Sequence, residues 1–451
     1  MFRKVLVANR GEIAVRIIRA LRELGIKSLA VYSKEDKYSL HAQLADQRLC
    51  IGEGPSSNHY LNKSQIITAA LNLEADAIHP GYGFLSENAD FARMCAENNL
   101  TFIGPPADAI STMGNKSSAR QKMSEAGVPI VKGTTEPVYD ASAAAKFADE
   151  IGYPVMIKAS SGGGGKGMRI AYDKVSFESQ FNMAQRESAN AFGDDTMYIE
   201  RYVENPRHVE IQIMADNFGN VVSLGERDCS VQRSHQKLVE EAPSPAVTPE
   251  MRVAMGDAAI AAAKAVNYTN AGTVEFIMDT LGNYYFMEMN TRIQVEHGVT
   301  EMVTGMDLVA EQITVAMGKP LSFSQEDIKM RGHSIECRIN AEIPEKNFMP
   351  SPGVVSYMHL PAGNGVRVDT ALYAGYKIPP DYDSMIAKVL VHAKTRGDAI
   401  RKMRSVLDEM VIGGVDTNLD FQFQIMRNPV FAEGRATTSF VNQMMRIDEG
   451  F

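Results

Sequence analysis

The sequence lacks the features that mark nucleic-acid-binding and membrane-spanning proteins. Its formal net charge is −9, whereas non-specific nucleic-acid binding needs a basic surface that neutralises phosphates. No apolar run is long enough to span a bilayer, and the apolar stretch after residue 4 is too short for a signal peptide. We therefore expect no nucleic acid and no membrane among the partners, although a nucleotide could still bind in a locally basic pocket.

Cysteine is scarce as well. Cys50, Cys95, Cys229 and Cys337 lie far apart and form no CxxC pair, so neither a zinc site nor a disulfide framework is indicated. A reduced, cytoplasmic setting fits this pattern best. The 451 residues, 45% of them hydrophobic, are ordinary for a globular chain of roughly three domains.

The first hundred residues alternate between strand and helix patterns. We expect strands at residues 5–8, 28–32, 75–79 and 100–103, with a helix after the first strand that ends near Gly25. This alternation predicts a parallel, doubly wound, Rossmann-like sheet. The turn at residues 9–12 reads NRGE and not GxGxxG, so the fold is predicted without a dinucleotide site.

A run of four glycines, residues 162–165, precedes Lys166 and Gly167. Glycines allow backbone N–H groups to face a phosphate without steric cost. The segment is not a P-loop, because Gly167 follows the lysine where Ser or Thr would stand. A glycine run alone is more often a flexible loop, but Lys158, Lys166 and the expected flanking strands favour a mobile lid over phosphates.

Residues 273–278 and 284–286 predict a β-hairpin, because a short turn containing Gly-Asn joins them. If that turn sets the register, Glu275 faces Glu288, and like charges opposite each other repel. A cation such as Mg²⁺ carrying a nucleotide phosphate would attract both carboxylates and so turn this repulsion into a stabilising interaction. Alternation places Glu288, Asn290 and Arg292 on one face, which favours a binding site over a solvated edge hairpin.

Several other polar stretches leave two interpretations open. Residues 208–213 place His208 on one strand face, where it is either a ligand or a structural hydrogen-bonding group. Residues 225–237 are unusually polar, with a solvated loop as the alternative to a site. Arg338, taken alone, is a surface ion-pair partner, and residues 79–88 are a structural turn from which Tyr82 could line a cleft.

Six segments in order resemble the biotin carboxylase family, the ATP-grasp subunit of acetyl-CoA carboxylase. They are residues 8–14 (ANRGEIA), 79–88 (HPGYGFLSEN), Lys158 with the glycine loop, 226–230 (ERDCS), 235–237 (HQK) and 288–297 (EMNTRIQVEH). The resemblance covers essentially the whole chain. It implies a Rossmann-like N-terminal domain at 1–115, an ATP-grasp region at 116–317 with a mobile lid at about 132–203, and a C-terminal biotin carboxylase domain at 318–451.

The resemblance also implies an activity. The expected reaction is ATP-dependent carboxylation of biotin on a carboxyl carrier protein with bicarbonate, the first half-reaction in making malonyl-CoA for fatty acid synthesis. ATP, two Mg²⁺ or Mn²⁺ ions and carrier-linked biotin would take part, with carboxyltransferase subunits as partners and a homodimer as the assembly. Pyruvate and propionyl-CoA carboxylases carry this module fused to further domains, and we expect no carboxyltransferase or biotin-bearing segment here.

Residue roles follow from the same resemblance. Lys237 and Arg292 would hold bicarbonate beside Gln294 and Val295, and Glu296 would be the general base. Arg338 would stabilise the enolate-like biotin oxygen, and Tyr82 would approach the biotin ring. Metal ions would bind Glu275, Glu288 and Asn290. ATP would contact Lys116, Lys158, Gly162, Gly163, Gly164, Gly165, Lys166, Gly167, Met168, Glu200, Arg201, Tyr202, Val203, His208, Gln232, His235, Glu275 and Glu288.

Three positions depart from the family pattern. Gly298 replaces a proline, which predicts a looser backbone after Glu296, and Ser234 replaces a common arginine. Asp381 replaces an aromatic residue, in a region without an assigned role. Two other classes stay open: another ATP-grasp ligase, such as half of a carbamoyl-phosphate synthase or a peptide ligase, and a catalytically silent regulatory subunit.

Overall fold

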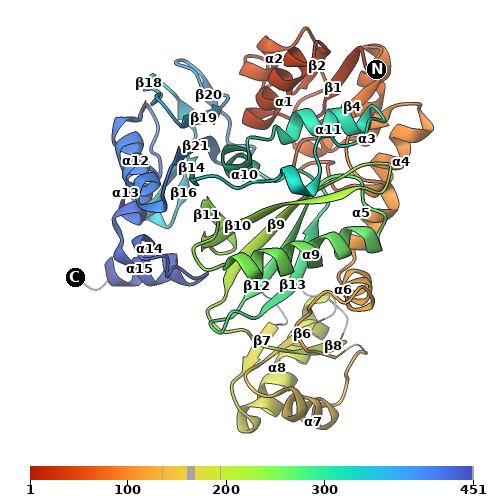
Figure 1. Cartoon of the computed structure of the whole chain (residues 1–451), viewed down its shortest axis with the longest axis vertical. Helices are drawn as coiled ribbons and strands as arrows, with labels where there is room; N and C mark the ends of the chain where they lie inside the picture. Colours follow the sequence, from red (N-terminus) through yellow and green to blue (C-terminus); the bar gives the residue numbers. More distant parts are fainter. Residues whose placement is uncertain (135, 160–167, 193–194, 449–451) are drawn as a thin grey trace. The chain divides into compact units, whose positions relative to one another are not determined.

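The computed structural model describes residues 1–134, 136–159, 168–192 and 195–448 (Figure 1). The chain forms two compact units. The first contains Met1–Val128, Arg207–Phe276 and Met287–Phe451, and the second contains Pro129–Pro206 and Ile277–Phe286. The three domains predicted from the sequence stay a prediction, as does the movement of a lid.

The first unit begins with a five-stranded parallel sheet in the order β3-β2-β1-β4-β5. This order confirms the Rossmann-like, doubly wound fold. Its strands are β1 (Lys4–Val7), β2 (Lys27–Tyr32), β3 (Gln47–Cys50), β4 (Ala77–His79) and β5 (Thr101–Phe102). Its helices are α1 (Gly11–Glu23), α2 (Leu40–Leu44), α3 (Lys63–Asn72), α4 (Ala89–Glu97), α5 (Ala107–Gly114) and α6 (Lys116–Glu125).

Helix α1 forms because apolar residues recur at helical spacing. Ile13, Ile17 and Leu21 are buried against the sheet. Gly25 follows the helix with φ +72°, a left-handed conformation that glycine adopts at little cost. The predicted helix and its predicted end are both confirmed.

An eight-stranded sheet in the order β13-β12-β9-β10-β11-β14-β21-β19 carries most of the candidate site. Its inner strands are buried over most of their length. The strands are β9 (Arg207–Ala215), β10 (Val221–Arg233), β11 (Gln236–Ala242), β12 (Asn270–Met278), β13 (Tyr284–Asn290), β14 (His333–Asn340), β19 (Val366–Thr370) and β21 (Met385–Ala393). The helices that follow β11 in the chain are α9 (Pro249–Ala265), α10 (His297–Thr304), α11 (Leu308–Ala316), α12 (Arg396–Glu409), α13 (Leu419–Arg427), α14 (Pro429–Ala432) and α15 (Phe440–Asp448).

The solvated-loop interpretation of residues 225–237 is wrong. Most of this stretch lies in β10, where it is buried. A two-residue turn of Ser234 and His235, with φ +47° and +67°, joins β10 to β11, as in type I′ hairpins. The polar side chains of β10 have partners inside the protein on neighbouring elements: Arg227 donates to Glu210 on β9, and Glu226 accepts from Arg252 on α9. Their polarity therefore did not indicate solvent exposure.

The predicted hairpin is confirmed as the neighbouring strands β12 and β13. Its turn is closed by the Asp279 N–H, which donates to the Asn283 carbonyl at 2.8 Å. Direct opposition of Glu275 and Glu288 across the strands stays a prediction. Three short strand pairs complete the first unit: β15 (Glu342–Ile343) with β16 (Met349–Pro350), β17 (Gly353–Val354) with β20 (Lys377–Ile378), and β18 (Tyr357–His359) with β22 (Val411–Gly413).

The second unit is a small antiparallel sheet in which β6 (Val155–Ala159) lies between β7 (Met168–Ala171) and β8 (Met197–Arg201). Helices α7 (Ala141–Ile151) and α8 (Lys174–Phe192) accompany it, and Phe177 and Phe181 belong to the same core as Ile157. The strand predicted through residue 203 ends at Arg201, so Tyr202 and Val203 follow it. Of the described helices, none combines the length and apolar character that a bilayer span needs.

We expect Ile17→Ala to lower the free energy of unfolding by about 2–5 kcal/mol, because it removes a fully buried side chain and leaves a cavity. Chemical denaturation monitored by circular dichroism measures the change. Arg19→Ala, on the exposed face of the same helix, is the matched control and should change stability little. Equal stability of the two variants would contradict the core assigned to α1.

Candidate active site

Lys237, near the start of β11, lies at the centre of a buried charged cluster. Its ammonium group donates to Glu296 Oε1 at 2.5 Å, Glu210 Oε2 at 2.6 Å, Glu275 Oε1 at 3.0 Å and Gln294 Oε1 at 3.1 Å. An ammonium group has three protons, so four acceptors compete for them. One cation therefore neutralises part of the charge on three carboxylates.

Glu275, on β12, is held by donors from several directions. The side-chain amides of Asn290 and Gln294 each donate to its Oε1 at 2.8 Å, and His208 Nε2 lies 3.0 Å from Oε2. Burial alone would raise the pKa of this carboxyl, but the charges of Lys237 and His208 outweigh it and hold the pKa well below the usual range. Glu275 is therefore ionised at neutral pH.

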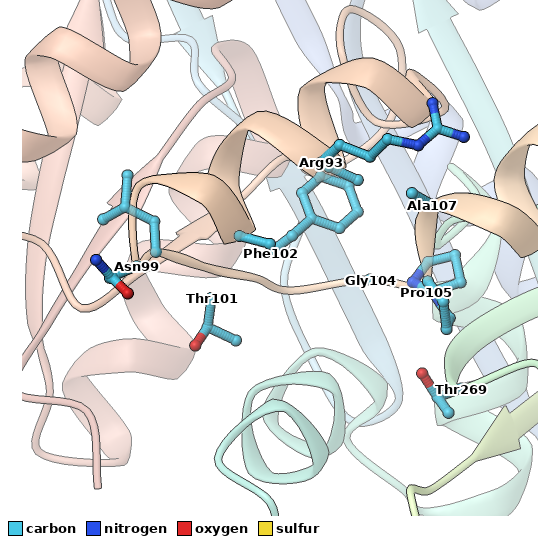
Figure 2. A pocket seen from close by; sticks show the side chains of 12 residues that line it. Arg93, Asn99, Thr101, Phe102, Gly104, Pro105, Ala107 and Thr269 are labelled. Atoms are coloured by element: carbon cyan, nitrogen blue, oxygen red, sulfur yellow. The ribbon is translucent and has the colours of Figure 1, made fainter.

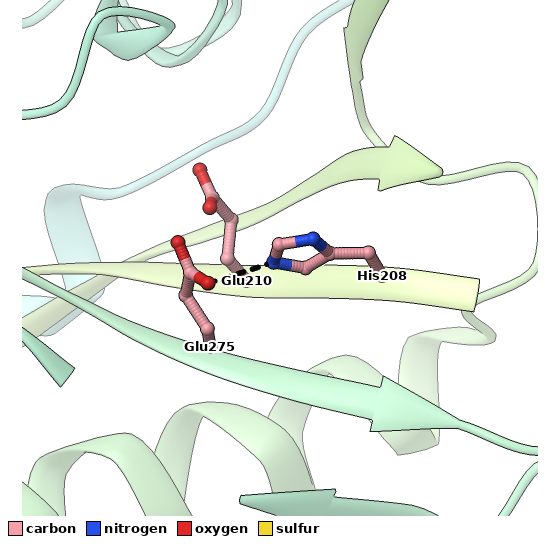
Figure 3. A group of neighbouring side chains, drawn as sticks. All are labelled: His208, Glu210 and Glu275. Atoms are coloured by element: carbon pink, nitrogen blue, oxygen red, sulfur yellow. Dashed lines mark ion pairs between the residues drawn. The ribbon is translucent and has the colours of Figure 1, made fainter. Parts of the chain in front are cut away.

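His208, Glu210 and Glu275 place ligand atoms within 4.8 Å of one another (Figure 3). Desolvation raises the pKa of Glu288, and the nearby charge of Glu275 adds to the rise, while Lys116 opposes it. This mutual effect agrees with the repulsion predicted for the two hairpin carboxylates. Oxygen-rich donors of this kind suit Mg²⁺ or Mn²⁺, so the residues present fit the predicted metal ions.

Glu296 is fully buried immediately before α10. Arg338 Nη2 donates to its Oε2 at 2.8 Å, while Lys237 occupies Oε1. Desolvation opposes ionisation, but Lys237 and Arg338 hold the pKa of Glu296 well below its usual range. Arg338 is thus no surface ion-pair partner, because both of its carboxylate partners are buried.

Arg227 on β10 was not predicted to belong to the site. It is fully buried, and it donates to Glu210 at 2.5 Å, Gln212 at 2.7 Å, Thr300 at 3.0 Å and Thr273 at 3.1 Å. These bonds satisfy a buried guanidinium that would otherwise be very costly. Arg227 thereby fixes the position of Glu210, which also accepts a hydrogen bond from Lys237.

Arg292 lies at the edge of the cluster. Its Nη2 donates to Asn290 Oδ1 at 2.9 Å and its Nε to Glu87 Oε2 at 3.0 Å. Glu87 also accepts from the Thr291 N–H at 3.0 Å, so it orients the whole turn after β13. Glu87 lies in one of the family motifs, but its contact with Arg292 was not predicted.

Lys388 on β21 supports the cluster from the side of the N-terminal sheet. Its side chain is fully buried, and Nζ donates to the Val295 carbonyl at 2.7 Å and lies 3.3 Å from Glu12 Oε1. The Tyr82 hydroxyl donates to the same Glu12 oxygen. Tyr82 therefore has a structural partner, and its approach to a biotin ring stays a prediction.

The remaining predicted nucleotide contacts lie at several places. Gln232 is buried on β10 opposite Lys237, His235 is exposed in the β10–β11 turn, and Lys116 begins α6. In the second unit, Lys158 pairs with Glu200 across β6 and β8, and Met168 is exposed. Residues 162–167, the predicted phosphate loop, lie outside the described residues.

The region around Asp381 gains a structural role through its neighbour. The Tyr382 hydroxyl lies 2.8 Å from Ser33 Oγ, and the Arg10 guanidinium stacks 3.9 Å from the Tyr382 ring centroid. Arg10 also forms a bidentate pair with Asp36. Tyr382 therefore joins the C-terminal part of the chain to the N-terminal sheet.

A separate surface hollow of about 600 Å³ lies around the end of β5 (Figure 2). Phe102, Pro105 and Thr269 are among its lining residues. Arg93 at its rim is paired with Asp90 at 3.0 Å. None of its lining residues belongs to the charged cluster, so the hollow adds nothing to the site.

Comparison with known proteins agrees with this geometry. Three family models match: "Biotin carboxylase, N-terminal domain" over residues 1–110, "Carbamoyl-phosphate synthase L chain, ATP binding domain" over residues 115–324 and "Biotin carboxylase C-terminal domain" over residues 336–443. The middle match and the cluster of carboxylates around Lys237 define an ATP-dependent ligase with an ATP-grasp domain.

Relatives extend the match to the whole chain. Biotin carboxylase 1 of Bacillus subtilis is 58% identical over 98% of each chain, and a pyruvate carboxylase subunit of Methanothermobacter thermautotrophicus is 52% identical over 99% of this chain and 91% of its own. A solved biotin carboxylase domain of a thermophilic 2-oxoglutarate carboxylase, bound to bicarbonate, superposes with a TM-score of 0.96 at 48% identity over 99% of each chain. The chain belongs to the biotin carboxylase family.

We expect Lys237→Met to lower the free energy of unfolding by about 3–5 kcal/mol at pH 7, because it leaves buried carboxylates without their cation. The depressed pKa of Glu296 gives stability that is fully present above the ordinary value of 4.5 and is lost progressively as the pH falls from that value through the lower pKa of the folded state. The difference between variant and parent should therefore shrink in acid. Denaturation at pH 7 and pH 4 tests this, with the exposed Lys34→Met as the control.

Proposed function

We propose that the chain carboxylates biotin on a carrier protein, using ATP and bicarbonate. The observation that carries this proposal is the buried Glu296 held between Lys237 and Arg338, beside the carboxylates Glu210 and Glu275. A nucleotide site alone does not need this arrangement. Two cations on one carboxylate provide anion-binding groups and a base in the same place.

ATP and its metal ions would occupy the Glu275 side of the cluster. Glu275, Glu288 and Asn290 would hold the metal, with His208 and Lys116 on the phosphates. Mg²⁺ or Mn²⁺ held by these residues would supply positive charge against the charge that develops during phosphoryl transfer. Lys158 and the glycine loop, Gly162 to Gly167, would bind the phosphates, with Glu200 to Val203 beside the adenine.

Bicarbonate would enter between Lys237 and Arg292. Glu296 is ionised at neutral pH and so can accept a proton, but a carboxylate held by two cations is a weak base. An anionic substrate that takes over Lys237 and Arg338 as partners would raise the pKa of Glu296. In this way substrate binding itself would activate the general base.

The biotin step would use Arg338. Bicarbonate, deprotonated by Glu296, would attack the γ-phosphate and displace ADP to form carboxyphosphate. Carboxyphosphate would break down to CO₂ and phosphate within a water-poor pocket, and this phosphate would take the N–H proton of biotin so that the nitrogen can attack CO₂. Arg338, freed from Glu296, would stabilise the negative oxygen that develops on the ureido group of biotin. Its planar guanidinium presents paired donors to such an oxygen.

The physiological setting is part of this proposal. We assign the chain to acetyl-CoA carboxylase, with a biotin carboxyl carrier protein and carboxyltransferase subunits as partners and malonyl-CoA as the product. The resemblance of the six sequence segments to the biotin carboxylase subunit of acetyl-CoA carboxylase supports it. A homodimer is supported by a structure described as a biotin carboxylase domain dimer at 49% identity, and a cytoplasmic location by four free cysteines.

The carrier partner can be tested directly. Purified chain, ATP, bicarbonate and biotinylated carrier domains from acetyl-CoA, pyruvate and 2-oxoglutarate carboxylases are compared for carboxybiotin formation. Preference for the acetyl-CoA carboxylase carrier is expected. Preference for another carrier would reassign the partner and leave the chemistry in place.

We expect Glu296→Ala to bind Mg–ATP nearly normally and to lose about 10²–10⁴ in bicarbonate-dependent ATP cleavage, the usual contribution of a positioned base. Arg338→Ala should keep that cleavage and lose most transfer to biotin. Phosphate release and carboxybiotin formation are measured side by side, with and without free biotin. Parental ATP cleavage by Glu296→Ala in the presence of bicarbonate would place the base elsewhere.

We expect Glu288→Gln to abolish turnover, because it removes a charged metal ligand while keeping the size of the side chain. The parent should bind Mg–ATP far more tightly than metal-free ATP, and the variant should lose that difference. Calorimetry with both forms of the nucleotide measures it. If metal-free ATP binds the parent equally well, the hairpin carboxylates have a structural role only.

A further inference from the structure

We propose that Glu240 and Glu336 form a carboxyl pair that shares one proton, and that this pair positions Arg338 for the biotin step. The inference rests on the proposed function of Arg338. Neither glutamate was predicted from the sequence to have a catalytic role. Both lie on neighbouring strands of the large sheet, β11 and β14 (Figure 1).

The two glutamates face each other directly. Glu240 on β11 and Glu336 on β14 are register partners in an antiparallel pair, so their side chains leave the same face of the sheet. Both residues are fully buried. Two ionised carboxylates in such a place would repel each other strongly in a low-dielectric environment.

Their oxygens show how the repulsion can be avoided. Glu240 Oε1 accepts from Arg338 Nε at 2.6 Å, but Glu240 Oε2 and both oxygens of Glu336 have no hydrogen-bond donor among the described residues. A proton on Glu336 would turn one of these oxygens into a donor, and Glu240, its register partner across the strands, is the neighbouring carboxylate that could accept from it. One shared proton makes a hydrogen bond between the two carboxyl groups, so fewer of these three buried oxygens are left without a partner.

The surrounding charges favour this state. Desolvation raises the pKa of Glu336 well above its usual range, with Lys388 opposing and Glu240 adding to the rise. Desolvation also raises the pKa of Glu240 to about 7, against the effect of Arg338. The proton therefore belongs mainly to Glu336, and Glu240 carries the charge that faces Arg338.

The other charged or titratable groups around Glu336 come from four parts of the chain. They are Arg338 on β14, Lys388 on β21, Glu296 before α10, and Tyr82 after β4. Lys388 is engaged with the Val295 carbonyl at 2.7 Å. The α10 backbone lies close to Glu336, because a Cβ at Gly298 would lie 3.4 Å from Glu336 Oε2 and would collide with Leu390 Cδ2.

The pair keeps one of the two carboxylate partners of Arg338 in place. The guanidinium donates to Glu240 through Nε and to Glu296 through Nη2. When substrate displaces Glu296, Glu240 is the remaining carboxylate on Arg338. A proton held on Glu336 keeps Glu240 ionised and in place without a second buried charge beside it, so Arg338 keeps its direction through the biotin step.

Three variants separate this role from simple packing. Glu336→Gln keeps a donor to Glu240 and should stay within about twofold of the parent in kcat and KM at neutral pH. Glu336→Leu removes the donor, and Glu240→Gln removes the charge facing Arg338. Each should lose about tenfold in kcat for biotin carboxylation, with unchanged KM for ATP and unchanged bicarbonate-dependent ATP cleavage without biotin.

Infrared spectroscopy observes the proton itself. At neutral pH the parent should show a protonated-carboxyl carbonyl band that is absent from Glu336→Gln and present in Glu311→Gln, a buried glutamate on α11 outside the pair. Because the pKa of Glu336 is raised, the protonated pair is stable at low pH and is lost as the pH rises through that pKa. The kcat of Glu336→Gln relative to the parent should therefore increase with pH.

The outcomes are distinguishable. A parent without biotin-dependent turnover contradicts the proposed function itself. An active parent that lacks the infrared band, or keeps it in Glu336→Gln, overturns the shared proton. If Glu336→Leu does not fold, the band and the pH dependence of Glu336→Gln decide, and Glu240→Gln with parental biotin carboxylation overturns the positioning role.

Discussion

The whole site depends on the compensation of buried charge. Lys237 touches three carboxylates, and Arg227 and Arg338 each neutralise a member of the same group. Removing only the carboxylates or only the cations would leave unpaired charges in the protein interior, where they are very costly. Because the carboxylates and cations must be buried together, the cluster needs an extended, rigid support, and the eight-stranded sheet provides it.

This compensation also prepares the reaction. In the structure the cations hold Glu296 as a paired anion, so the base is kept ionised but weak. An anionic substrate can replace Glu296 as the partner of Lys237 and Arg338 without adding unbalanced charge. The resting cluster therefore already has the electrostatic form that bicarbonate would need.

The supporting residues around the cluster act through orientation. Glu87 fixes Arg292, Lys388 fixes the backbone at Val295, and Glu240 fixes Arg338. None of these contacts is local, since each joins residues about a hundred or two hundred positions apart. Such groups hold the reacting side chains in place more precisely than a flexible loop could.

Local pattern was sufficient for the elements and for the family. The alternation of the first hundred residues predicted the parallel sheet, Gly25 marked the end of α1, and the Gly-Asn turn indicated the β12–β13 hairpin. Each depends on backbone conformation or on spacing within a few residues. The order of the motifs identified the family, and most residues of the cluster with it.

Which polar side chains contact each other was decided only by the tertiary structure. The polar segment at residues 225–237 looked solvated because sequence shows which side chains are polar and not which of them meet. In the fold it is a buried strand whose Arg227 binds Glu210, and the facing of Glu240 and Glu336 arises from strand register alone. Alternation can assign a residue to a face, but the neighbour on that face comes from another strand, so the charges that set each pKa become known only when the sheet is assembled.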